Sequence, residues 1–130
     1  PGEAGGISAI DLNTGAVVWK APPSQTSCLE VKERCSTGQL AAVTAIDGAV
    51  FSGSLDGYLR AYDSTSGKVI WEYDTRNTYD SVNGIKAMGG SLNGPGPAIA
   101  AGHLYVNSGY GMWNMWLPGN ALIAFSVNGE

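Results

Sequence analysis

An internal repeat constrains the fold more than any other feature of this sequence. The segment AIDLNTGAVVWK at residues 9–20 recurs as AYDSTSGKVIWE at residues 61–72, so residues 9 and 61 are 52 positions apart. A second motif, VTAIDGAVFSGSLDGYLR at residues 43–60, recurs in part at residues 98–123, where it carries an insertion. Residues 124–129 then match the start of the first motif. Self-similarity at a fixed period is typical of arrays in which one small unit stacks on the next.

Each unit has the pattern of strands and tight turns. Residues 17–20 and 69–72 alternate with period two, and turns of the Asp/Asn-x-x-Gly kind lie beside them. No window of 11 or more residues carries a helical period, and 19 of the 130 residues are glycine. The sequence therefore predicts an all-β chain. Strands are expected at residues 7–12, 16–21, 41–46, 49–54, 58–63, 68–74, 96–101, 103–108 and 120–126.

A unit of about four strands that ends in tryptophan is typical of a propeller blade. Residues 1–130 are therefore expected to form a fragment of one β-propeller domain. Residues 7–21 would be the outer half of a blade, residues 41–75 a complete blade, and residues 96–127 three strands of the last blade. The polar, Gly-rich segment 76–94 is expected to be a long connecting loop.

Charge and composition exclude several functions. The formal net charge is −4 and the pI is about 4.8, which argues against nucleic acid or anionic lipid as a partner. No run of 18 apolar residues occurs, so no membrane span is expected. The single histidine, His103, leaves no Ser/His/Asp set for hydrolysis.

The repeat and its connecting loops resemble a known family. The unit GxLDGYLRAYDxxxGKxxWxxxT at residues 53–75 resembles the repeat of dehydrogenases that depend on pyrroloquinoline quinone (PQQ). The span 35–130 is similar to the C-terminal end of polyvinyl-alcohol dehydrogenase-type quinoproteins. The passages that carry this second resemblance are GQxAAxT at 38–44, VNGxKA at 82–87, GGSLNGPGP at 89–97, SGYG at 108–111 and PGNxL at 118–122.

This resemblance implies an eight-bladed, PQQ-dehydrogenase-like propeller, of which the chain holds about two to two and a half four-stranded blades. It implies PQQ with calcium on the central axis, an alcohol as substrate, and a periplasmic or secreted location. The implied partners are the remaining blades or other copies of the chain, with a cytochrome c as electron acceptor. No Cys-x-x-Cys-His haem motif is present. The catalytic base and the calcium ligands are expected outside this chain, so the isolated fragment is expected to be inactive.

Five residues are candidates for contact with the quinone. Trp113, with Gly111 beside it, resembles a tryptophan that contacts PQQ in methanol-dehydrogenase-type relatives, and a flat ring suits a planar quinone. The alternative is that Trp113 covers the propeller top or a partner. Lys86 could pair with a PQQ carboxylate, and Asn83 and Asn93 could donate to its oxygens. The alternative is that these three are solvated loop residues.

Cysteine and tryptophan positions suggest structural roles. Cys28 and Cys35, with six residues between them in a polar segment, most simply form a disulfide in a secreted protein, with free thiols and a metal site as the alternatives. Trp19 and Trp71 hold the same place in successive repeats, so packing between repeats is expected. Asp56 and Asp63 are expected to cap backbone amides in turns.

Two functions therefore stand against each other. The first is the C-terminal portion of a periplasmic PQQ-dependent alcohol dehydrogenase of the polyvinyl-alcohol dehydrogenase type, forming part of the wall of the quinone chamber. The second is a non-catalytic propeller scaffold for protein interaction, like an outer-membrane assembly lipoprotein. A WD-type repeat is disfavoured because its period is shorter, at about 40–45 residues. The absence of an initial Met suggests a cut at Pro1, and the expected blade closure suggests a natural end at Glu130.

Overall fold

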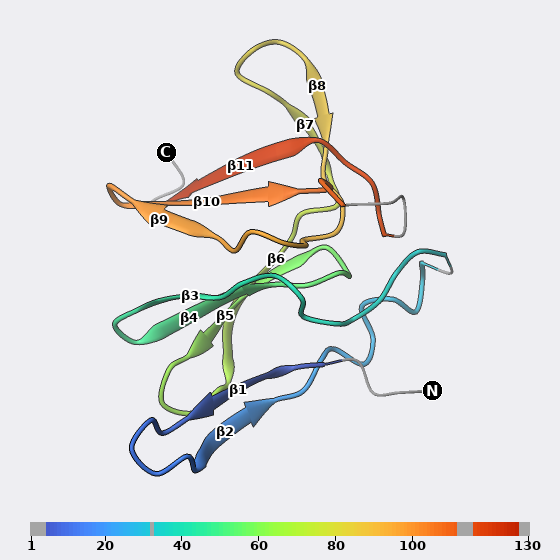
Figure 1. Ribbon diagram of the computed structural model, residues 1–130. Coiled ribbons are helices and arrows are strands. Elements are labelled where there is room, and N and C mark those ends of the chain that lie inside the picture. The colour runs from blue at the N-terminus through green and yellow to red at the C-terminus, as the bar shows by residue number, and fades with distance from the viewer. Residues whose placement is uncertain (1–4, 32, 112–115, 128–130) are drawn as a thin grey trace.

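The computed structural model describes residues 5–31, 33–111 and 116–127. Within these ranges the protein is all-β, as predicted, and has no helix. Four antiparallel sheets follow one another along the chain (Figure 1). The first holds β1 (Ile7–Ile10) and β2 (Val17–Ala21); the second β3 (Thr44–Ile46), β4 (Ala49–Gly53), β5 (Tyr58–Asp63) and β6 (Val69–Asp74). The third holds β7 (Thr78–Asp80) and β8 (Lys86–Met88); the fourth β9 (Ala98–Ala100), β10 (His103–Ser108) and β11 (Ala121–Ser126).

The turn between β5 and β6 shows why the repeat carries the pattern Asp-x-x-x-Gly. Asp63 Oδ1 accepts hydrogen bonds from the amides of Thr65 and Ser66, at 3.1 and 2.7 Å. Gly67 then has a φ of +70°, in the left-handed region that glycine enters without strain. The capping role predicted for Asp63 is confirmed.

Tryptophan joins the first sheet to the second. Trp19 Nε1 donates to the carbonyl oxygen of Ser64 at 2.9 Å. Its ring lies against Gly67, where an added Cβ would come within 2.5 Å of Trp19 Cε3. Trp71, its counterpart one repeat later, meets Phe125 of the fourth sheet edge to face, with 5.4 Å between ring centroids. The predicted packing of both tryptophans between repeats is therefore confirmed.

The second and fourth sheets share an apolar core. Leu59 of β5 and Leu104 and Val106 of β10 are buried together with Leu92 from the connection between β8 and β9. Four partly buried residues surround them: Phe51, Ile99, Ile123 and Phe125. Burial of each large aliphatic side chain contributes roughly 1.5–3 kcal/mol, so this interface holds the two sheets as one unit.

The segment 76–94 differs from the expected long loop. Thr78–Asp80 and Lys86–Met88 pair as a hairpin, which projects from the end of the stacked sheets (Figure 1). Ser91 and Leu92, further along, are buried at 1% exposure. The strands have only three residues each, too few for a period-two pattern to stand out from a polar segment.

Candidate functional site

A cleft of about 760 Å³ opens where several chain segments meet at one end of the second sheet. Residues 26–31, which follow β2, form one wall. Tyr58, Asp74 and Arg76, from the start of β5 and the end of β6, also line the cleft. The remaining lining residues lie at the end of β8, directly after it, or before β11: Met88, Gly89, Leu117 and Pro118.

Two of the charged residues that line this cleft, Asp74 and Arg76, are paired with each other. Arg76 Nε and Nη2 donate to the two carboxylate oxygens of Asp74 at 2.8 and 2.6 Å. The guanidinium also lies 4.9 Å from the centre of the Tyr58 ring. Partial burial opposes ionisation of Asp74, but the hydrogen bonds from Arg76 outweigh it and lower the pKa of the carboxyl. This bidentate geometry fixes both side chains.

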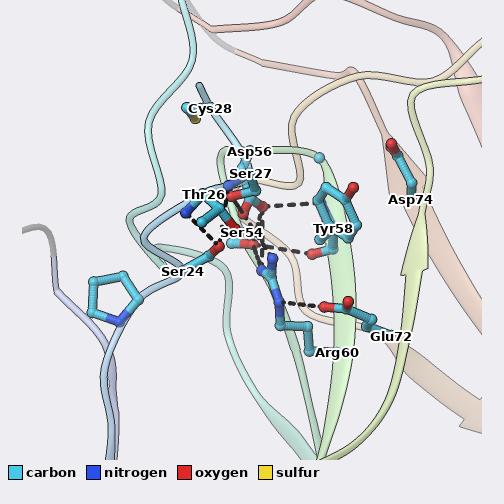
Figure 2. A network of polar contacts seen from close by, with 12 residues as sticks. Ser24, Thr26, Ser27, Cys28, Ser54, Asp56, Tyr58, Arg60, Glu72 and Asp74 are labelled. Atoms are coloured by element: carbon cyan, nitrogen blue, oxygen red, sulfur yellow. Dashed lines mark hydrogen bonds and ion pairs between the residues drawn. The ribbon is translucent and has the colours of Figure 1, made fainter. Parts of the chain in front are cut away.

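A second ion pair, between Asp56 in the β4–β5 turn and Arg60 in β5, is buried (Figure 2). Arg60 Nη2 donates to Asp56 Oδ2 at 2.9 Å, and the two residues are 5% and 0% exposed. Asp56 Oδ1 also accepts from the Ser54 hydroxyl and, at 3.0 Å, from the amide of Tyr58. The turn-capping role predicted for Asp56 is confirmed, and the carboxylate has a charged partner in addition.

Among the described residues, the hydrogen bonds from the wall at residues 26–31 to the second sheet and to Arg76 all involve Ser27. Ser27 Oγ donates to Asp56 Oδ2 at 2.5 Å (Figure 2). Arg76 Nη1 donates to the Ser27 carbonyl oxygen at 3.3 Å. Cys28 forms a disulfide with Cys35, with 5.6 Å between their Cα atoms. The predicted disulfide is therefore confirmed.

The Asp56 carboxyl makes stability depend on acidic pH. Its burial raises the pKa, but hydrogen bonds from Arg60, Ser27 and Ser54 and the charge of Arg60 together lower it below 3.8. Because the folded-state pKa is below the unfolded value, this contribution to stability is complete above the unfolded pKa and is lost as pH falls through the folded pKa.

We expect the free energy of unfolding, measured by urea titration between pH 7 and pH 2.5, to fall most steeply below about pH 4. The variant Asp56→Asn should be less stable at pH 7 and should lose less stability on acidification. The same pH dependence in both proteins would contradict the assignment.

Four glycines form a close junction beside the cleft. A Cβ added to Gly89 would overlap the Thr75 carbonyl oxygen, and one added to Gly109 would overlap the backbone of Gly119. Gly90 and Gly119 are likewise pressed against backbone oxygens, those of Leu117 and Met88. The motifs GG at 89–90, SG at 108–109 and PG at 118–119 thus lie side by side. Glycine is required at these positions because three segments of the backbone approach each other too closely for a Cβ atom.

Buried hydroxyl groups complete this junction. Ser108 Oγ accepts from the amide of Gly90 at 2.8 Å and lies 2.7 Å from Thr75 Oγ1. The amide of Gly109 donates to the carbonyl oxygen of Ser91 at 2.9 Å. The connection after β8 is therefore bonded to the end of β10 through both backbone and side chains.

The predicted cofactor residues that the structure describes lie on different segments of the chain. Asn83 Oδ1 accepts from the Ser81 hydroxyl and from the amide of Ile85, so it stabilises the turn between β7 and β8. Lys86 pairs with Asp80 on the exposed face of the same hairpin. Asn93 lies in the connection to β9, Gly111 is exposed after β10, and Trp113 is outside the described residues.

Metal ligands are also not gathered in the part of the chain that the structure describes: no group of three or more His, Cys, Asp or Glu side chains lies close enough to hold a metal ion. Lys86 and Asn83, the two predicted quinone contacts on the β7–β8 hairpin, already bind neighbouring groups.

Sequence reasoning missed the residues that build the cleft. Tyr58, Arg60 and Arg76 received no role because a pair such as Asp56 and Arg60 looks like an exposed turn in sequence. Their surroundings include residues distant in sequence, such as Ser27, which is bonded to both Asp56 and Arg76. The one available signal was the clustering of charged residues around an Asp-Gly turn in DGYLR at 56–60.

Comparisons with known proteins agree with this architecture. A family model described as outer membrane protein assembly factor BamB matches residues 3–130. A polyvinylalcohol dehydrogenase from Pseudomonas sp is 41% identical over 96% of this chain, and the match covers 21% of that enzyme. The chain thus spans about one fifth of the length of this curated relative.

Two solved structures share the fold. The quinohemoprotein alcohol dehydrogenase from Comamonas testosteroni superposes with a TM-score of 0.65 at 25% identity, over 98% of this chain and 18% of that one. BamB from Moraxella catarrhalis superposes with a TM-score of 0.62 at 23% identity, over 98% of this chain and 33% of that one. Among the described residues, no helix is long and apolar enough to cross a membrane.

Proposed function

The chain belongs to the PQQ-type repeat family described as outer membrane protein assembly factor BamB, and from this premise we propose that it forms part of the quinone chamber wall in a PQQ-dependent alcohol dehydrogenase. The observation that carries the proposal is the 41% identity to a polyvinylalcohol dehydrogenase over 96% of the chain. The conserved fold alone would not separate this function from others, because fold does not imply function.

In this proposal the chain is the C-terminal portion of the enzyme and works in the periplasm. PQQ and calcium are held mainly by residues outside this chain, with Trp113 bordering the quinone. Residues 41–75 form a complete blade, residues 7–21 the outer half of the preceding blade, and residues 96–127 three strands of the last. The remaining blades, or other copies of the chain, complete the propeller, and a cytochrome c accepts the electrons.

The proposed contribution of the described residues is to hold neighbouring chain segments in fixed positions. The glycine junction holds the segments on either side of residues 112–115, because Gly109 and Leu117 are both bonded to Ser91. A rigid support of this kind is what a planar ligand needs in order to be oriented. No catalytic base or metal ligand is assigned to this chain.

Loading with cofactor provides the test. In the dehydrogenase that contains this chain, PQQ with calcium at about 100 times the dissociation constant should stabilise the folded protein by about 2.7 kcal/mol, raising its melting temperature. The Trp113→Ala variant should bind PQQ about tenfold more weakly, because it loses an aromatic contact. Val82→Ala, at an exposed hairpin position, is the control and should bind as wild type does.

A non-catalytic scaffold is the second proposal, and the description of the matching family supports it. The two functions predict opposite results in the same melting experiment. A melting temperature unchanged by PQQ and calcium, with no quinone-dependent dye reduction, would exclude the dehydrogenase and leave the scaffold.

A further inference from the structure

We propose that the Cys28–Cys35 disulfide is a redox-controlled latch that keeps one wall of the cleft closed. The wall is the segment 26–31, whose residues 26, 27 and 29–31 line the cleft. Reduction of the disulfide is expected to release this segment while the sheets stay folded. The inference concerns the cleft wall alone and does not require that PQQ is bound.

The segment has weak attachments of its own. Among the described residues, two hydrogen bonds join it to the sheets, and both pass through Ser27. Its remaining bonds are local turns, such as those from the amides of Leu29 and Val31 to the carbonyl oxygens of Thr26 and Cys28. Leu29 is 72% exposed, so it adds little apolar burial. The disulfide is therefore the strongest constraint on the wall.

The groups that bind Ser27 keep their partners when it leaves. Asp56 retains Arg60, Ser54 and the amide of Tyr58. Arg76 retains both carboxylate oxygens of Asp74. Release of the wall therefore leaves no buried charge without a partner. An unpaired buried charge would carry a large free-energy cost and would oppose the release. Both ion pairs are formed without the wall, whose hydrogen bonds to them, among the described residues, are those of Ser27.

The closed loop also holds strain. Arg34, between the cysteines, has a φ of +60°, in the left-handed region that non-glycine residues avoid. A closed ring keeps such a residue in place, and an open chain lets it relax. Strain and the regained chain entropy both favour release after reduction.

The chemistry is thiol–disulfide exchange with a small thiol as reductant. One thiolate attacks a sulfur of the pair and forms a mixed disulfide, and a second thiolate displaces the protein sulfur. Cys28 and Cys35 each gain one electron and one proton, and the reductant is oxidised to its own disulfide. Both cysteines are only half-buried, so a small thiol can approach.

Hydrogen exchange with and without dithiothreitol tests the latch on the whole protein. Once alkylation shows two free thiols per chain, the rate of amide exchange in residues 26–31 should rise roughly 10- to 100-fold, because the disulfide no longer restricts this segment. Exchange at Leu59 and Ala61 in β5 should be unchanged. The Cys28→Ser/Cys35→Ser variant should exchange rapidly with or without reductant, and oxidised Ser27→Ala should fall in between.

Two results would overturn the proposal. One is slow exchange in residues 26–31 with both thiols free, which would mean that Ser27 alone holds the wall. The other is faster exchange throughout β4 and β5, which would mean that the disulfide stabilises the whole fold and not the wall alone. If the double serine variant does not fold, reduction of the wild-type protein still separates these outcomes.

Discussion

Replacing Arg60 with methionine should lower the free energy of unfolding by about 3–5 kcal/mol. The substitution keeps much of the side-chain volume but leaves the carboxylate of Asp56, which is fully buried, without its charged partner. Ser27, Ser54 and the Tyr58 amide still donate to it, but none of them carries a charge. Urea unfolding at pH 7, followed by tryptophan fluorescence, measures the change.

Two further variants separate this effect from simple loss of packing. Glu72→Gln removes the other carboxylate that contacts Arg60, but the Glu72 side chain is 53% exposed and should contribute less than about 1 kcal/mol. In Asp56→Asn/Arg60→Met no buried charge remains, so this protein should be more stable than Arg60→Met alone. A loss below about 1 kcal/mol in Arg60→Met would show that water reaches Asp56.

Replacing Gly89 with alanine should prevent stable folding altogether. The new methyl group would overlap the carbonyl oxygen of Thr75, which is backbone and cannot rotate away. Moving the connection would break the bond from the Gly90 amide to Ser108 and would displace Leu92 from the core. Overpacking costs about 1–3 kcal/mol where side chains can adjust, and more where only backbone can move.

Gly94→Ala is the matched control for this prediction. Gly94 has a φ of +81°, but an added Cβ would meet no atom within 4 Å. Its cost is therefore limited to backbone strain, about 1–2 kcal/mol. Circular dichroism and thermal melting of the two variants compare steric overlap with strain alone. Equal melting temperatures would contradict the close approach at the glycine junction.

The repeat made most strands predictable, because turn chemistry and period-two alternation act over a few residues. Asp63 and Gly67, for example, specify their turn without help from the rest of the chain. The buried Asp56–Arg60 pair was not predictable, because its burial depends on chain segments that arrive from residues 24–31 and beyond β8. Gly89 and Gly90 indicated a loop in sequence, although backbones from three places meet there. Local signals thus defined the strands, and long-range contacts defined the cleft.

The order of the strands has a consequence for folding during synthesis. Every pairing within the four sheets joins strands that are neighbours in sequence, so each hairpin can form as soon as its second strand has left the ribosome. The Gly89 connection cannot be completed in this way, because its partners Ser108 and Gly119 are translated later. We therefore expect nascent chains that end before Gly119 to hold formed hairpins with an unsealed, protease-sensitive connection between the second and fourth sheets.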